Sequence, residues 1–304
     1  GAANVDPVLK ERVAAAITRL GYVRNDLASS LRAGRSTATI GLIIEDLRNP
    51  FYSTIASAVA QVAREHDSLL MISSVEENPA QERKLILELS QRRVDGLLIV
   101  PAGNDHSYLQ AEIDMGIPAV FLDRPPVGLE TDTVLIDNRG GAEAAIRRLH
   151  GEGHRRIGIL TDAPGIFTTH ERFEGVRLAF EQSTVPLDRG LVRQGLHDPD
   201  AAAAAAAELL AVSDPPTAFF CGNNRIAIGT LTELLRSGAA AELVAFDDFE
   251  YARLVPRAFT VVTYDDRELG RQGAELLFRR IDGDRTPPVH TVLPTRLEPR
   301  GLSA

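Results

Sequence analysis

The stretch TIGLIIEDLRNPFYSTIASAVAQVARE, residues 39–65, decides the fold. Residues 39–44 form a continuous apolar run, which is typical of a strand covered by helices on both faces. A polar turn containing Asp46 follows, and residues 51–65 carry the small and apolar pattern of a helix. A buried strand that leads through a short turn into a helix is the repeating unit of a parallel α/β sheet.

The same unit repeats along the rest of the chain. We expect strands at 39–44, 68–73, 96–100, 119–122, 133–136, 156–160, 191–194, 218–221, 243–246 and 289–293, and helices at 51–65, 80–93, 107–115, 140–151, 170–182, 199–212, 224–236 and 267–281. Ten strands are many for one doubly wound sheet. The sequence therefore predicts an α/β protein with two doubly wound parallel-sheet subdomains that divide near residues 137–138.

Composition predicts a soluble protein with a full core. The chain has 304 residues, of which 44% are hydrophobic and 25% charged, and its apolar runs are too short to span a membrane. Its start has no signal-peptide pattern, and a lone Cys221 excludes an intrachain disulfide. The formal net charge is −9, yet residues 1–36 carry six basic and three acidic side chains. A basic head on an acidic body is compatible with nucleic-acid binding, although so small an excess also arises by chance.

Two helices are predicted ahead of residue 39. The first covers residues 7–20, where Pro7 suits the first turn and apolar residues recur at helical spacing. The second covers 25–34, with Asn25 or Asp26 as its cap and Gly34 at its end. A helix this short does not form alone in water, so it needs a partner surface.

Polar and aromatic side chains gather where the predicted strands end. In open parallel sheets, ligands bind outside the carboxyl ends of the strands. Taken singly, each residue has a plainer interpretation, since Asp and Asn after a strand commonly form turns or helix caps; for Asp162, Asn224 and Asp248 we favour that interpretation. Taken together, they predict a cleft for a small polyhydroxylated or planar ligand. The set is Asp46, Phe51, Tyr52, Asp123, Arg124, Asp162, Arg172, His197, Asn223, Asn224, Asp247 and Asp248.

Over nearly its whole length the chain resembles bacterial transcription regulators of the lactose and purine repressor family. The matching segments include Leu27-Ala28-Ser29-Ser30-Leu31-Arg32, Thr39-Ile40-Gly41-Leu42-Ile43, Asn49-Pro50-Phe51-Tyr52, Arg93-Val94-Asp95-Gly96, Gly153-His154-Arg155-Arg156-Ile157-Gly158, Arg172-Phe173-Glu174-Gly175, Phe220-Cys221-Gly222-Asn223, Ala245-Phe246-Asp247-Asp248 and Leu297-Glu298-Pro299-Arg300-Gly301. No single segment is diagnostic, but their order and spacing together are specific.

The resemblance implies a domain organisation. Residues 1–24 would be the last part of a helix-turn-helix headpiece, whose reading helices lie before residue 1, and 25–38 the hinge helix and linker. A periplasmic-binding-protein-like core would follow. Its first subdomain would comprise 39–136 plus about 265–292, and its second 137–264 plus about 293–304.

The resemblance also assigns site residues. The hinge would contact DNA through Asn25, Ala28, Leu31 and Arg32, with Leu31 as an apolar wedge between base steps. The effector site would contain Asp46, Phe51, Tyr52, Asp123, Arg124, Thr168, Arg172, His197, Asn223, Asp247 and Tyr264. Among them, Asp123, Arg172, Asn223 and Asp247 match a clamp for sugars. Tyr264 departs from the family, because a ligand-binding glutamine often stands there.

We therefore expect a ligand-responsive, DNA-binding transcriptional regulator, and more specifically a repressor. It is expected to be cytoplasmic and to act as a homodimer or higher oligomer. Its effector is expected to be a sugar or sugar derivative. The alternatives are a regulator that senses a nucleobase and the solute-binding protein of a transporter, which shares the core fold. No phosphate-binding loop, metal-ligand cluster or nucleophile elbow is present, so neither an enzyme nor a cofactor or metal is expected.

Overall fold

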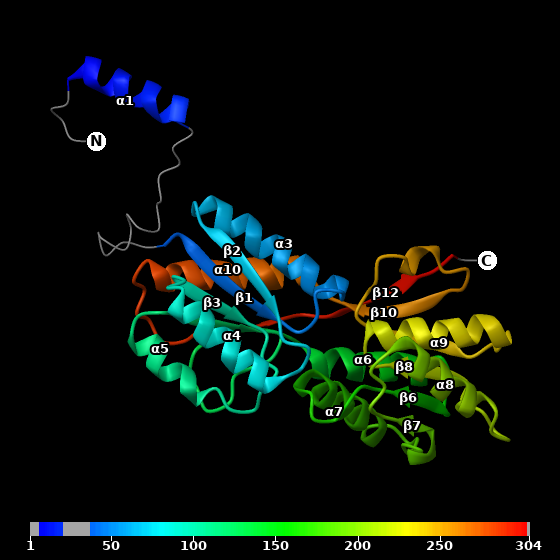
Figure 1. The fold of residues 1–304 in the computed structure, drawn as a ribbon. Coiled ribbons are helices and arrows are strands. Elements are labelled where there is room, and N and C mark those ends of the chain that lie inside the picture. The colour runs from blue at the N-terminus through cyan, green and yellow to red at the C-terminus, as the bar shows by residue number, and fades with distance from the viewer. Residues whose placement is uncertain (1–5, 21–36, 303–304) are drawn as a thin grey trace.

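The computed structural model describes residues 6–20 and 37–302, and within the second range it contains two six-stranded sheets (Figure 1). The order in the first sheet is β11 (His290–Leu293), β5 (Asp132–Ile136), β4 (Ala119–Leu122), β3 (Gly96–Ile99), β1 (Thr39–Ile44) and β2 (Leu69–Ser74). The order in the second is β12 (Arg296–Arg300), β10 (Phe259–Thr263), β9 (Glu242–Phe246), β8 (Ala218–Cys221), β6 (Ile157–Leu160) and β7 (Val192–Arg193).

Helices cover both faces of each sheet, so each sheet with its helices forms one lobe. In the first lobe, α3 (Pro50–Glu65) packs with α10 (Asp266–Ile281) on one face, while α4 (Pro79–Gln91) and the short η1 (Ser107–Leu109) and α5 (Gln110–Asp114) cover the other. In the second lobe, α6 (Asn138–Gly151) pairs with α7 (Phe167–Glu181), and α8 (Pro199–Leu210) with α9 (Asn224–Ser237). The strands are buried between these layers, as their apolar runs predict. Two further single-turn helices, η2 (Arg189–Leu191) and η3 (Ala252–Leu254), belong to the second lobe.

The two lobes share one strand order, and the chain passes between them three times. After β5 it enters the second lobe, after β10 it returns to build α10 and β11, and before β12 it crosses again. In each lobe the second strand lies at the edge beside the first, and the third lies on the first strand's other side. This order creates a switch point between the first and third strands, where open α/β sheets bind ligands. The cleft at these strand ends is therefore built from both lobes.

The predicted two-sheet α/β fold is confirmed, but the list of ten strands was incomplete. Phe259–Thr263 is a fully buried strand of the second sheet that the prediction omitted. Arg296–Arg300 is a polar edge strand that pairs antiparallel with β10, and Pro299 lies within it. A proline is tolerated in an edge strand, where one side makes no ladder hydrogen bonds, and RLEPR carries no apolar signal. The strand β2 also differs from the expected buried run, because Leu69 is 73% exposed at the sheet edge.

The predicted N-terminal helix is present as α1 (Pro7–Leu20), and it has no buried residue. The predicted hinge helix, with Asn25, Ala28, Leu31 and Arg32, lies outside the described residues. None of the described helices combines the length and apolar character needed to cross a bilayer.

Candidate ligand-binding site

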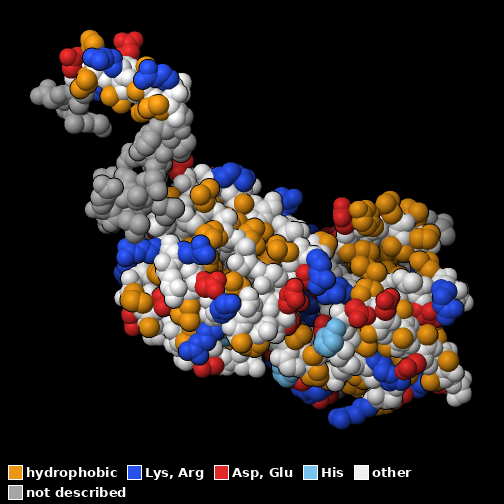
Figure 2. Space-filling view, viewed as in Figure 1, with side chains coloured by type: hydrophobic (Ala, Val, Ile, Leu, Met, Phe, Trp, Pro, Cys, Tyr) orange, Lys and Arg blue, Asp and Glu red, His pale blue; other side chains and the backbone are white. Residues whose placement is uncertain are grey.

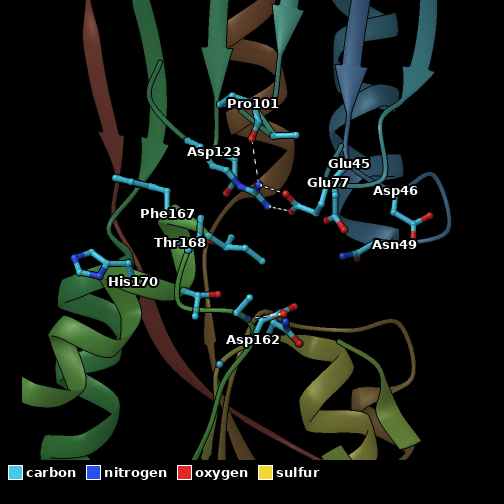
Figure 3. A pocket seen from close by; sticks show the side chains of 18 of the residues that line it. Glu45, Asp46, Asn49, Glu77, Pro101, Asp123, Asp162, Phe167, Thr168 and His170 are labelled. Atoms are coloured by element: carbon cyan, nitrogen blue, oxygen red, sulfur yellow. Dashed lines mark hydrogen bonds and ion pairs between the residues drawn. The ribbon is translucent and has the colours of Figure 1, made fainter. Parts of the chain in front are cut away.

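A cavity of about 790 Å³ lies between the two lobes at the carboxyl ends of their strands. Figure 3 shows Glu45, Glu77 and Asp123 reaching it from the first lobe, and Thr168 and Asp162 from the second. The structure places around this one cavity every residue predicted for the effector site. These are Asp46, Phe51, Tyr52, Asp123, Arg124, Thr168, Arg172, His197, Asn223, Asp247 and Tyr264.

The first-lobe wall centres on Arg124, which follows β4. Its two terminal nitrogens donate to the Glu77 carboxylate at 2.6 and 2.9 Å, and one of them also donates to the carbonyl of Pro101 at 3.1 Å (Figure 3). Asp123 lies next to this pair and is 3% exposed. Its nearest cation is the Arg124 Nε at 3.6 Å, and its carboxylate receives no hydrogen bond from the described part of the chain. Burial raises the pKa of Asp123 to about 6. Its carboxylate oxygens are thus free to accept from ligand hydroxyls.

The second-lobe wall centres on Arg172 of α7. Arg172 donates to both carboxylate oxygens of Asp247 at 2.9 and 3.0 Å, to the Asn138 side chain at 2.7 Å and to the carbonyl of Gly222 at 2.7 Å. Its guanidinium also stacks over the Phe246 ring, 3.8 Å from the ring centre. The protein therefore uses four of its five N–H donors. Arg172 holds the carboxylate of Asp247 in place and keeps one donor for a ligand.

Asp123 and Asp247 occupy equivalent positions in the two lobes. Each follows the fourth strand of its own sheet, and their φ angles are +65° and +67°. A residue other than glycine is uncommon in this left-handed region, and Asp is one of the types that tolerates it. Such strained positions concentrate at ligand clamps. The repeated topology thus places two carboxylates in the same unusual backbone conformation on opposite walls of the cavity.

Three aromatic rings form the apolar part of the site. The Phe51 ring lies 4.8 Å from Tyr52 and 6.0 Å from Tyr264, in edge-on contacts. Tyr52 and Tyr264 are 3% and 9% exposed. The Tyr264 hydroxyl donates to Asp247 at 2.9 Å, and burial raises its pKa well above the ordinary value. Apolar faces beside convergent polar groups are typical of small-molecule sites.

The structure corrects the interpretation of Asn224 as a helix cap. The cap of α9 is Asn223, whose side-chain oxygen accepts from the backbone nitrogen of Ile226 at 2.9 Å. The Asn224 amide instead donates across the cleft to Asn49 at 3.1 Å. This bond joins the first turn of α9 in the second lobe to the residue that caps α3 in the first.

His197 and Asp162 lie at the rim of the cavity. The His197 Nδ1 lies 2.6 Å from the Asp162 carboxylate, and the His197 side chain is 69% exposed. Asp162 also accepts from the backbone nitrogen of Ala163, which agrees with the turn role favoured for it. Thr168, by contrast, is buried in the first turn of α7.

Several lining residues were missed in the sequence. Glu45 directly precedes Asp46 at the end of β1, and the strand-end rule that selected Asp46 applies equally to it. Burial, and then the charge of Glu77, raises the pKa of Glu45 to about 7. Glu77 has no such signal, because it comes from a loop whose positive φ angles at Glu76 and Glu77 the sequence does not reveal.

The cavity lining is acidic, and each of its described arginines contacts a carboxylate. It contains seven carboxyl groups and four guanidinium groups. Arg124 and Arg172 bind carboxylates as described above. Arg48 contacts Asp46 at 3.0 Å, and Arg225 approaches the same carboxylate from the second lobe at 3.7 Å. Among the described lining residues, no arginine is without a carboxylate partner.

One cluster of the described residues has metal-ligand chemistry, and it lies away from the cavity. Potential ligand atoms of Glu152, His154 and Glu242 lie within 4.8 Å of one another. Arg148 donates to both glutamates, at 2.9 and 3.1 Å. The Arg148 guanidinium thus offsets one of the two glutamate charges in this cluster, and nothing in the described part of the chain further supports a metal there.

Known proteins share this architecture. The chain is 31% identical to the transcriptional regulator CelR of Thermobifida fusca over 98% of this chain and 90% of that protein. It is 26% identical to the ribose operon repressor of Haemophilus influenzae, with coverages of 92% and 85%. A solved complex of the transcriptional regulator CelR with cellobiose superimposes with a TM-score of 0.76 at 29% identity, over 97% of this chain and 91% of that one.

The family model of periplasmic binding proteins and the sugar-binding domain of the LacI family matches residues 37–299. That range contains both sheets, apart from the last residue of β12, and every described residue of the cavity lining. The chain belongs to the LacI family of transcriptional regulators.

Proposed function

We propose that this protein is a ligand-responsive, DNA-binding transcriptional repressor whose cavity binds a neutral sugar. The observation that carries the proposal is the cavity between two lobes, with a buried Asp123 on one wall and the Arg172–Asp247 pair on the other. Family membership supports the regulatory role. The first subdomain would comprise residues 39–136 plus about 265–292, and the second 137–264 plus about 293–304.

Charge favours a neutral ligand over an anionic one. A phosphate or carboxylate ligand needs an unpaired cation, because burying an unmatched negative charge among carboxylates is costly. Every arginine of the described lining already contacts a carboxylate. Asp123 supplies acceptors for ligand hydroxyls, Arg172 supplies one donor, and Phe51 supplies an apolar edge. Hydroxyl groups on an otherwise apolar ring match this set, as in a sugar.

Calorimetry with the full chain tests this ligand class. The panel consists of ribose, cellobiose, glucose 6-phosphate and adenine, titrated into the wild type and Asp123→Asn. At least one neutral sugar should bind, and Asp123→Asn should weaken it by about tenfold or more, since hydrogen bonds to a buried charge are the strong ones. Asp123→Asn should remain folded because no donor in residues 6–20 or 37–302 depends on that carboxylate. The control Asp282→Asn changes an exposed residue outside the cavity and should bind normally.

Other results would contradict the proposal. Binding of adenine alone would favour the nucleobase-sensing alternative. Tight binding of glucose 6-phosphate would remove the neutral-ligand argument. Arg172 is not used for this test, because its loss would leave Asp247 without its partner and destabilise the lobe itself.

The proposed mechanism couples the cavity to DNA through the hinge segment. Ligand contacts on both walls favour one angle between the lobes, and a change in that angle moves the first lobes of a dimer relative to each other. The hinge residues Asn25, Ala28, Leu31 and Arg32 would follow this movement at the operator, in the cytoplasm, where the DNA is. No catalytic step or cofactor is part of this proposal.

A hinge variant tests the DNA-binding part separately. In protein that carries its complete headpiece, Leu31→Ala should weaken operator binding strongly by removing the apolar wedge, and should leave sugar affinity nearly unchanged. Unchanged operator binding would remove the wedge hypothesis. Sugar binding without any DNA binding by the wild type would favour the solute-binding alternative.

An exposed apolar face of the second lobe supports a homodimer. Tyr251 and Leu254, around η3, are 64% and 67% exposed, and Ile228 and Leu235 on α9 are 40% and 45% exposed. Figure 2 shows hydrophobic side chains gathered over the segment that joins β9 to β10. Exposed apolar side chains gathered on one surface mark an interface, and a second copy of the chain suits a regulator that binds paired half-sites. Sedimentation velocity should give a dimer or larger species; a monomer at micromolar concentration would contradict this part.

A further inference from the structure

A second cavity of about 490 Å³ lies beside the ligand-binding site, at the junction of the lobes. It is lined by Pro50, Phe51, Ser53, Thr54, Asp247, Asp248, Phe249, Glu250, Arg253, Thr263, Tyr264 and Asp266. It shares three residues with the first cavity, namely Phe51, Asp247 and Tyr264. The two spaces therefore lie on opposite sides of one thin partition.

Tyr264 is the central member of this partition. It stands on the second crossover between the lobes, immediately after β10, and its side chain is almost fully buried. The hydroxyl is held by Asp247 at 2.9 Å, while the ring meets Phe51 edge-on at 6.0 Å and Phe246 at 6.4 Å. Phe51 and Asp247 also line both spaces, so the Tyr264 ring is one of three side chains between them, and it is the largest of the three. Truncating Tyr264 at Cβ would remove the ring and open a passage beside Phe51 and Asp247.

The second cavity has the chemistry of a site for a further sugar unit. Ser53 and Thr54 contribute hydroxyl groups, Glu250 and Arg253 contribute charged hydrogen-bonding groups, and Phe249 contributes an aromatic ring. The Asp248 carboxylate is bound by Arg300 at 2.8 Å, so it is fixed in place. Polar groups beside an aromatic surface are what the first cavity offers to a ligand as well.

We propose that Tyr264 determines the length of the ligand that this protein accepts, by closing the first cavity against the second. This inference rests on the proposed function, since it takes the ligand to be a neutral sugar. A short sugar ends at the Tyr264 ring. A longer oligosaccharide is rejected because its next unit meets the ring, although space and hydrogen-bonding groups for that unit lie directly behind it.

Two substitutions distinguish the contribution of the Tyr264 ring from that of its hydroxyl group. Tyr264→Phe removes the hydrogen bond to Asp247 and keeps the partition, whereas Tyr264→Ala removes both. The probes are sugars of increasing length from the cello-, xylo- and malto-oligosaccharide series, from the single sugar to the tetrasaccharide, titrated calorimetrically into the wild type and both variants. Thermal unfolding confirms that each variant is folded, and a crystal structure of Tyr264→Ala reports whether the two cavities have merged.

We expect Tyr264→Ala to improve the affinity for a longer sugar relative to its shorter homologue by at least about tenfold. Tyr264→Phe should retain the length preference of the wild type, even if its affinities fall together. Equal length preferences in Tyr264→Ala and Tyr264→Phe, or a merged cavity without any gain for longer sugars, would overturn the inference and leave the proposed function standing. Failure of the wild type to bind any sugar would overturn both.

Discussion

At the residue scale, the half-buried Glu45 and the buried Asp123 are two carboxyl groups with unusual properties on the first-lobe wall of the cavity. Glu45 and Asp123 have pKa values of about 7 and 6, raised in both cases first by burial. Neither forms a close, hydrogen-bonded pair with an arginine of the described ranges, unlike Asp247, which is held by Arg172. The site thus holds Asp247 and Glu77 in fixed pairs with arginines and leaves the Asp123 carboxylate available as an acceptor. That difference decides which variants report on ligand binding and which report on folding.

The first prediction concerns Glu45 and pH. Native Glu45 holds its proton up to about pH 7, whereas in the unfolded chain the group titrates near its ordinary value of 4.5. The native state therefore binds more protons between these values, and the free energy of unfolding falls as pH rises through this window. Glu45→Gln removes the cost of the buried charge. It should be more stable than the wild type by about 1–3 kcal/mol at pH 8 and equally stable at pH 4.

Urea unfolding at pH 4, 6 and 8 measures this difference. The matched control is Glu250→Gln, an exposed residue whose substitution should change stability by less than about 0.5 kcal/mol at every pH. A stability gain for Glu45→Gln that is the same at pH 4 and pH 8 would show that the charge of Glu45 is not its source.

At the element scale, the position of α7 depends on how closely it approaches α6. A Cβ atom added at Gly175 on α7 would lie 2.2 Å from the backbone oxygen of Arg139 on α6, which no real contact allows. Arg172, three residues earlier on the same helix, reaches Asn138 at the start of α6 and Asp247 beyond β9. Helix packing in the second lobe therefore positions the clamp.

The second prediction follows from this contact. Gly175→Ala should push α7 away from α6, lower stability by about 1–3 kcal/mol and weaken ligand binding, because Arg172 moves with the helix. Gly151→Ala, at the end of α6, is the matched control, since its added Cβ meets nothing within 4 Å. The control should be neutral or slightly stabilising, as alanine favours helices over glycine. Thermal unfolding measures the change in stability, and calorimetry measures the change in ligand affinity. A normal ligand affinity in a destabilised Gly175→Ala would show that the packing of α7 does not position Arg172 for ligand binding.

At the scale of the whole molecule, the lobes touch each other directly beside the cavity. The Asn224 amide donates to Asn49 at 3.1 Å, and Arg225 lies 3.7 Å from Asp46. Both contacts join the start of α9 to the segment between β1 and α3. They exist only while the lobes are close together, so a ligand that bridges the walls and these contacts should reinforce each other.

The third prediction is a coupling between Asn49 and Asn224 in ligand binding. Asn49→Ala and Asn224→Ala should each weaken sugar affinity a few-fold. The double variant should lose less binding free energy than the sum of the two single losses, and the difference, the coupling energy, should be about 0.5–1.5 kcal/mol. The cycle is needed because Asn49 also caps α3, so its single variant carries a separate stability cost. Asn104→Ala, a lining residue of the first lobe, should be additive with Asn224→Ala. If the effects of Asn49→Ala and Asn224→Ala on binding free energy simply added, the hydrogen bond between the two residues would not contribute to ligand affinity.

Much of the fold and of the candidate site was predictable from local signals. Buried strands are apolar runs in the sequence, and helices are capped amphipathic segments. The alternation of these two patterns therefore predicted the two-sheet architecture. Since the carboxyl ends of parallel strands meet at one edge of a sheet, Asp123 and Asp247 could each be placed at the ligand-binding edge of their own sheet without coordinates. The polar strand β12 was missed because edge strands need no apolar pattern. The effector role of the lining residues remains a proposal.

What the sequence by itself determined was the order of the helices and of ten of the twelve strands in the described residues, the polar residues at the strand ends and the family resemblance, because each depends on neighbours along the chain. Only the tertiary structure decided which groups pair. It paired Arg124 with Glu77, left Asp123 without a hydrogen-bond donor among the described residues, and brought Asn49 against Asn224. It also placed Tyr264 between two cavities. These pairings depend on loop conformations and on three crossovers between the lobes, which bring together residues far apart in the chain, and no local pattern encodes their distances.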